Sequence, residues 1–141
     1  MELREARPDD QARVAELLDQ LGYPTSPAAA GRRLQVLSAS PHDAVWLAVR
    51  EGTVVGLVAI HVSGALEYDG AVAKVSALVV DKAARREGVG KQLMVLAERE
   101  ARRRGCELLF LTTSERRADA HAFYRSIGFE ETGRRFAKTL D

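Results

Sequence analysis

The sequence predicts an α+β fold with a mixed central sheet, in which an antiparallel meander is extended by one parallel pair of strands and flanked by about four helices. Three features lead to this prediction. Two helical segments come first, strands joined by turns occupy the middle, and a helix then leads into a further buried strand. Strands joined by tight turns pair antiparallel, whereas a strand, a crossover helix and a second strand pair in parallel.

The first 40 residues are predicted to form a short strand, Glu2 to Arg7, and two helices. Pro8 and two following aspartates supply a helix start, after which apolar side chains recur at helical spacing: Val14, Leu17, Leu18 and Leu21. Gly22 ends this helix. Ser26 and Pro27 are an N-cap and first-turn pair for a second helix, whose apolar positions are Ala30, Leu34 and Leu37.

From residue 44 the apolar period changes from helical to alternating. Residues 44–50, a turn at Glu51 and Gly52, and a β-branched run from Val54 to Val62 predict a hairpin. A turn over residues 64–70 then leads into a third long strand, Val72 to Val80.

The second half is predicted to be helical from Gly88 to Arg104, with Gly105 as the stop. A buried strand follows from Cys106 to Thr113, and we expect it to run parallel to the strand that ends at Val80. The chain is predicted to end in a helix and two short strands: Arg116 to Ile127, Phe129 to Thr132 and Arg135 to Leu140. Without a linker or repeat, we expect a single domain over residues 1–141.

The composition excludes several classes of protein. A hydrophobic fraction of 46% excludes a disordered chain, and a net charge of +1 argues against a nucleic-acid binder. One cysteine, no apolar run of the roughly 20 residues that span a bilayer, and a polar N-terminus predict a cytoplasmic protein with no membrane partner and no metal site. The charge is unevenly spread, because residues 1–84 carry a net −3 and residues 85–141 a net +4.

A glycine-containing loop lies where this positive half begins, directly between the strand ending at Val80 and the helix of residues 88–104. The start of a helix has unpaired N–H groups, so the loop is a candidate anion site as well as a simple tight turn. A Walker loop is excluded because Gln92 stands where it needs Ser or Thr. A Rossmann fingerprint is excluded because Leu93 replaces its third glycine.

Two motifs resemble those of the GNAT superfamily of N-acyltransferases. Arg85, Gly88 and Gly90, placed directly after the strand, resemble its acetyl-CoA signature. The segment Ala120 to Phe129 resembles its second motif, a helix that ends in Phe-Tyr and is followed by Gly-Phe. The predicted order of elements is also similar, so the resemblance covers essentially the whole chain.

The resemblance implies acetyl-CoA as cofactor and a strand that bulges and splays from its parallel neighbour. The pantetheine arm would then pair with the strand backbone of Leu78, Val79 and Val80. The pyrophosphate would be held by the loop and helix start, which comprise Arg85, Arg86, Glu87, Gly88, Val89, Gly90 and Lys91. Arg117, which replaces an Asn common in the family, is a candidate for a CoA phosphate.

The resemblance also implies candidate catalytic residues. Tyr124 matches the position of the acid that protonates the departing thiolate, while a purely structural or CoA-contact role is left open. Where many relatives carry a Glu in the strand, this chain has Ser76, so the candidates for a base are water held by Ser76 and the turn carboxylates of Glu67 and Asp69. His61 is expected in the core or in a cleft.

We therefore expect an acetyl-CoA-dependent N-acetyltransferase that acts on a primary amine of a small molecule or peptide by direct attack in a ternary complex. Two alternatives stay open: a non-catalytic acyl-CoA sensor or interaction domain of the same fold, and nucleic-acid binding through the arginines. The oligomeric state is undetermined, with a homodimer among the possibilities.

Overall fold

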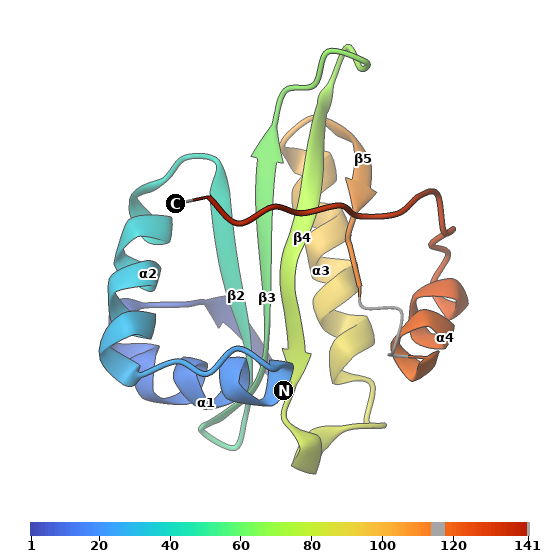
Figure 1. The fold of residues 1–141 in the computed structure, drawn as a ribbon. Coiled ribbons are helices and arrows are strands. Elements are labelled where there is room, and N and C mark those ends of the chain that lie inside the picture. The colour runs from blue at the N-terminus through green and yellow to red at the C-terminus, as the bar shows by residue number, and fades with distance from the viewer. Residues whose placement is uncertain (114–117, 141) are drawn as a thin grey trace. The chain divides into compact units, whose positions relative to one another are not determined.

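The computed structural model describes residues 1–113 and 118–140. The chain forms two compact units, Met1–Phe110 and Leu111–Asp141, and the first contains the whole sheet (Figure 1). No helix in the described residues is long and apolar enough to cross a membrane.

The sheet of the first unit has five strands in the order β1-β2-β3-β4-β5. The strands are β1 (Glu2–Glu5), β2 (Asp43–Arg50), β3 (Thr53–Ser63), β4 (Ala71–Val80) and β5 (Cys106–Phe110). The first four strands pair antiparallel, and β4 and β5 form the parallel pair. The prediction of a mixed sheet with one parallel pair is confirmed, although β5 ends at Phe110 rather than Thr113.

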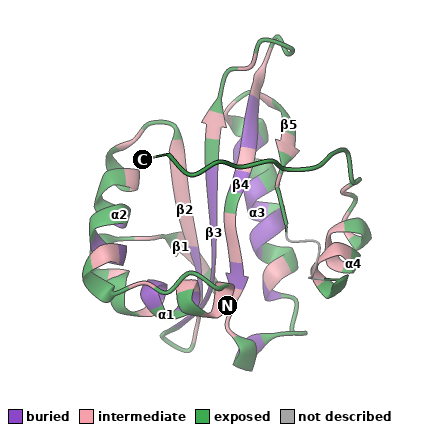
Figure 2. Cartoon of the chain, viewed as in Figure 1, coloured by how far each residue is buried: buried purple, intermediate pink, exposed green. Residues whose placement is uncertain are grey.

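The two faces of the sheet are covered by different helices (Figure 1). The helices of this unit are α1 (Gln11–Leu21), α2 (Pro27–Ala39) and α3 (Val89–Arg103), with short 3₁₀ turns η1 (Pro8–Asp10) and η2 (Lys82–Ala84). Apolar residues of α1 and α2 pack on one face against Leu47, Leu57 and Val79. The next residue to Leu57, Gly56, points to the opposite face, where α3 packs against it. Figure 2 shows the buried positions gathered in β3, in β4 and along α3.

The predicted helix signals are found at the ends of the helices. The Ser26 hydroxyl accepts a hydrogen bond from the Ala29 N–H at 3.1 Å and so caps α2. Gly22 ends α1 with a φ of 107°, and Gly105 follows α3 with a φ of 78°. Both conformations are left-handed, which explains why glycine stands at these positions.

The second unit contains α4 (Ala118–Ser126), followed by Gly128 with a φ of 97°. The two predicted terminal strands, Phe129 to Thr132 and Arg135 to Leu140, are wrong, because residues 129–140 form no strand. Their apolar side chains find no buried face: Phe136 and Leu140 are 95% and 85% exposed. An alternating pattern becomes a strand only where one of its faces is packed.

Replacement of Gly56 by alanine tests the contact between the sheet and α3. The added Cβ would lie 3.1 Å from Leu93 Cδ1, 3.2 Å from Val89 Cγ1 and 3.2 Å from the Val79 carbonyl oxygen. We expect Gly56→Ala to destabilise the fold by about 1–3 kcal/mol, measured by chemical denaturation. Gly64→Ala is the matched control, because nothing lies within 4 Å of its Cβ position. Equal stability of the two variants would contradict the packing described.

Candidate acyl-donor site

A β-bulge at Ser76 interrupts the ladder between β3 and β4. Ala77 pairs with Ala59 and Val75 pairs with Ile60, which leaves Ser76 as an extra residue without a partner in β3. Ser76 is exposed. The bulge implied by the family resemblance is therefore present, and it lies at Ser76.

The parallel pairing of β4 ends close to this bulge. Only Ala71 to Lys74 pair with β5, and the last pair is Lys74 with Phe110. β4 itself continues to Val80. Within Met1–Phe110, the edge of β4 that faces away from β3 therefore has no strand partner from Val75 onward. Backbone N–H and C=O groups of this edge are available to an extended ligand.

The loop after β4 leads directly into the N-terminus of α3. Arg86 has a φ of 65° and Gly88 a φ of 81°, so the chain turns twice through the left-handed region before the helix begins. The first helical hydrogen bond runs from the Gln92 N–H to the Gly88 carbonyl oxygen. The N–H groups before Gln92 consequently have no acceptor within the helix, which suits this turn to an anion.

Asp81 attaches the start of this loop to α1. One of its oxygens accepts from the Ala83 N–H at 2.9 Å, and the other accepts from Arg13 Nη2 at 2.8 Å. Arg13 also donates to the Val54 carbonyl oxygen in β3, and the Lys82 N–H donates to Gln20 Oε1 at 2.9 Å. The hydrogen bond from Arg13 holds the pKa of Asp81 below its usual range, so the carboxylate is charged at neutral pH.

The basic side chains of the loop between β4 and α3 are exposed. The Glu87 carboxylate forms an ion pair with Arg50 at the end of β2. Arg85, Arg86 and Lys91 are exposed and form no ion pair with any residue that the structure describes. Together with the start of α3, these three side chains give the turn a positive surface.

The second motif forms a compact aromatic group in the second unit. The Tyr124 ring meets Phe123 and Phe129 edge-on, with ring centroids 5.5 and 6.0 Å apart. The left-handed Gly128 reverses the chain, so that the Phe129 N–H donates to the Tyr124 carbonyl oxygen at 3.0 Å. The Phe-Tyr and Gly-Phe pairs thus act together: they end α4 and hold the Tyr124 ring in place.

The other predicted site residues lie at different distances from the bulge. Glu67 is exposed in the connection between β3 and β4, at the far end of β4 from the loop at residues 81–88, so the structure does not bring it to Ser76 (Figure 1). Arg117 lies outside the described residues. Leu78 and Val80 are half-buried and Val79 is buried, which leaves their backbone edge as the part open to a ligand.

Sequence reasoning missed the anchoring pair of Arg13 and Asp81. Their contact joins α1 to the end of β4 across 68 positions of the chain. The only local signal was an Asp directly after a strand and before a short turn, which is a common capping arrangement.

Solved structures share this fold over nearly the whole chain. A transcriptional regulator from Bacillus halodurans superposes with a TM-score of 0.90 at 24% identity, covering 99% of both chains. An aminoglycoside N-acetyltransferase solved in complex with CoA gives a TM-score of 0.86 at 21% identity, covering 99% of this chain and 93% of that one. The fold is therefore the α+β fold of the GNAT acetyltransferases.

Sequence relatives identify the family. A model of the acetyltransferase (GNAT) family matches residues 11–129. Aminoalkylphosphonate N-acetyltransferase of Salmonella typhimurium is 39% identical over 94 residues, which are 67% of this chain and 61% of that protein's length. IAA acetyltransferase of Azospirillum brasilense is 32% identical over 126 residues, 89% of this chain and 80% of that protein. The chain belongs to the acetyltransferase (GNAT) family, and these matches support an acyltransferase with acetyl-CoA as cosubstrate.

Replacement of Asp81 by asparagine tests the anchor of the loop. Asp81→Asn removes the charge that holds Arg13, so we expect weaker binding of CoA by several-fold in calorimetry and a stability loss of about 1–2 kcal/mol. Asp9→Asn is a matched control, because Asp9 is an exposed residue whose ion pair with Arg7 spans 3.8 Å.

The same variant has a predictable pH dependence. Because the folded-state pKa of Asp81 is lowered, its contribution to stability is present above the unfolded value of about 3.9 and is lost as the pH falls through the folded value. The wild-type protein should therefore lose more stability on acidification below about pH 4 than Asp81→Asn does. Parallel acid profiles for the two proteins would contradict the role given to this ion pair.

Proposed function

We propose that the protein transfers the acetyl group of acetyl-CoA to a primary amine of a small molecule. The observation that carries this proposal is the free backbone edge of β4 beside a positive loop and the start of α3. A long cosubstrate with amide groups at one end and phosphates at the other needs these two features in this order.

The donor would lie along β4 and the loop. Backbone groups of Leu78, Val79 and Val80 would pair with the pantetheine amides, and backbone N–H groups of residues 86–91 would bind the pyrophosphate. Arg85, Arg86 and Lys91 are exposed cations beside that turn and are suited to the phosphates. Gly88 serves by its left-handed backbone, which a residue with a Cβ adopts only with strain.

The reaction is a direct attack in a ternary complex. The amine nitrogen, once deprotonated, attacks the thioester carbonyl carbon, the C–S bond breaks, and the CoA thiolate leaves and takes up a proton. We assign the proton on the thiolate to Tyr124, whose ring is fixed by its edge-on aromatic neighbours. We assign to Ser76 the binding of a water at the bulge, since its side chain is exposed there.

The relatives favour a small acceptor. The relative from Salmonella is named for an aminoalkylphosphonate acceptor, and an aminoglycoside acetyltransferase shares the fold. We therefore favour a small-molecule amine over a peptide as the acceptor. We assign the reaction to the cytoplasm, where a free cysteine is common. A homodimer is compatible with this proposal, but the proposal does not depend on it.

Two measurements on the wild-type protein test the proposal. Calorimetric titration with acetyl-CoA should show saturable binding, and a thiol-release screen against a broad panel of amines should find a substrate. Binding of acetyl-CoA without thiol release from any amine would instead support a non-catalytic acyl-CoA sensor. Absence of binding would contradict the proposal entirely.

Removal of the Tyr124 hydroxyl tests the assigned acid. We expect Tyr124→Phe to lower kcat by about 10²-fold, the usual contribution of a general acid, with little change in the affinity for CoA. Tyr23→Phe is the control, because the Tyr23 side chain is exposed in the connection between α1 and α2. A Tyr124→Phe enzyme with an unchanged kcat would remove the acid role and leave Tyr124 as a packing residue.

A further inference from the structure

Three polar residues meet in register on neighbouring strands. Asp43 of β2 pairs with His61 of β3, and His61 pairs with Lys74 of β4. Directly opposed residues of antiparallel strands project from the same face, about 5 Å apart. This face also bears Leu57 and Val79, so it is the face that α1 and α2 cover farther along the sheet.

The imidazole of His61 is oriented by Asp43. His61 Nδ1 lies 2.9 Å from Asp43 Oδ1. Burial alone would raise the pKa of Asp43, but hydrogen bonds from Ser40 and His61 hold it below the usual range. A charged carboxylate only accepts hydrogen bonds, so Nδ1 is the donor to Asp43, and Nε2 is the ring nitrogen that Asp43 does not engage.

The His61 side chain is accessible to solvent. The His61 side chain is 49% exposed, whereas that of Asp43 is only 14% exposed. Of the two expectations for His61, a core or a cleft position, the exposure excludes the core, and the contact with Asp43 defines an oriented imidazole with an open face. The half-buried carboxylate of Asp43 lies behind the ring and holds it through Nδ1.

His61 lies close to the bulge of β4. Its partner Lys74 is two residues before Ser76, and Lys74 is also the last residue of β4 that pairs with β5. Along a strand, two residues span about 7 Å. His61 is therefore one strand away from the part of β4 where the free edge begins.

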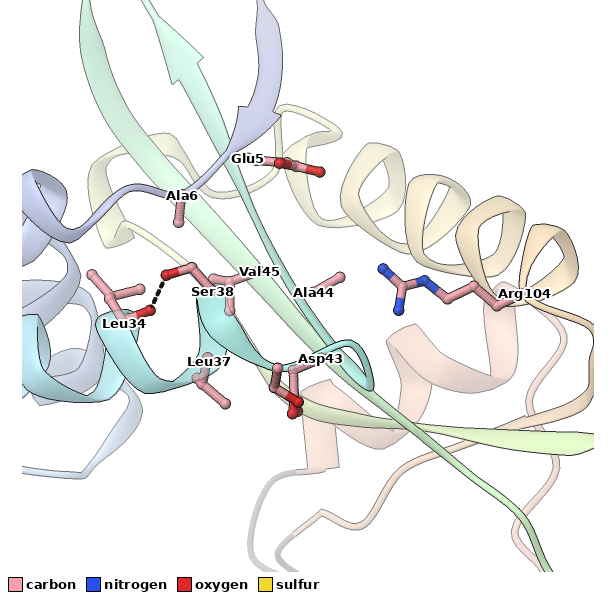
Figure 3. A pocket seen from close by; sticks show the side chains of 10 residues that line it. Glu5, Ala6, Leu34, Leu37, Ser38, Asp43, Ala44, Val45 and Arg104 are labelled. Carbon is pink, nitrogen blue, oxygen red and sulfur yellow. Dashed lines mark hydrogen bonds between the residues drawn. The ribbon is translucent and has the colours of Figure 1, made fainter.

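Other charged groups lie around the Asp43–His61 pair. Lys74 of β4 faces His61 from the side opposite Asp43. His42 precedes Asp43 and adds a favourable charge interaction to it when protonated. Asp43 also borders a cavity of about 210 Å³ whose lining includes Glu5 and Arg104 (Figure 3). Arg104 is engaged there, since it donates to Glu100 and to the Pro41 carbonyl oxygen.

We propose that His61 is the general base that deprotonates the acceptor amine, and that Asp43 is its positioning residue. The assignment rests on the acetyl transfer proposed above and supplies the base that the strand position of Ser76 lacks. The protonated amine gives one proton to His61 Nε2, and its freed lone pair attacks the thioester carbon. The C–S bond breaks and the thiolate takes its proton from Tyr124. The second proton of the amine nitrogen is lost through solvent to the Tyr124 phenolate, and the imidazolium returns its proton to solvent.

The rate test uses His61→Gln with His42→Gln as the matched control. With the amine found in the screen, we expect His61→Gln to lower kcat by about 10²-fold or more, while its affinity for CoA stays within two-fold of wild type. Retained CoA binding shows that the variant is folded. His42→Gln should keep the wild-type kcat. A His61→Gln enzyme with wild-type kcat overturns the proposal.

The pH profile separates a base from a structural histidine. For a base, kcat/KM of the wild type rises with pH to a plateau, and His61→Gln loses this rise. Asp43→Asn removes a negative charge that favours the imidazolium, so the rise should move to lower pH. Lys74→Gln removes a positive charge and should move the rise to higher pH. Shifts in the same direction, or none, contradict the proposal.

The tautomer of His61 gives a test that is independent of turnover. In ¹⁵N NMR of the wild-type protein at neutral pH, we expect His61 with its proton on Nδ1, and loss of this preference in Asp43→Asn. A proton on Nε2 overturns the proposal even if the enzyme is active. A wild-type protein that acetylates no amine contradicts the proposed function itself, whereas normal turnover by His61→Gln contradicts only the choice of base.

Discussion

The early end of pairing between β4 and β5 is the constraint on which the site depends. β5 follows β4 only as far as Lys74, and the bulge at Ser76 changes the course of β4 just beyond that point. Neither feature is required by the rest of the sheet, since β3 and β4 pair to the end of β4. A continuous parallel pair would satisfy the same backbone groups internally and would leave no edge for a ligand.

The loop that follows is held from two sides. Asp81 ties its start to Arg13 of α1, and Val89 at the end of the loop is buried under the sheet at Gly56. A turn that must bind an anion through backbone N–H groups benefits from such fixed ends, because less conformational entropy is lost on binding. The cations near the turn remain exposed, so that the anchored backbone provides geometry and the side chains provide charge.

Local signals in the sequence predicted most helices and strands. The features that sequence analysis missed depend on contacts between residues far apart in the chain. Caps such as Ser26 and stops such as Gly22 act within one turn of helix and could be identified directly. The contact of Arg13 with Asp81 depends on how α1 docks on the sheet, which no local pattern encodes. The open position of His61 depends on where α1 and α2 stop covering the sheet. The prediction of two terminal strands was wrong because an alternating pattern forms a strand only where one of its faces is buried.

Hydrogen exchange with and without CoA tests the central claim most directly, because it reports on individual backbone N–H groups. We expect CoA to protect amides on the free edge of β4 between Val75 and Val80 and amides of residues 86–91, while the ladder between β1 and β2 is unchanged. Protection confined to other segments, or none in β4 at saturating CoA, would contradict a donor site built on this edge.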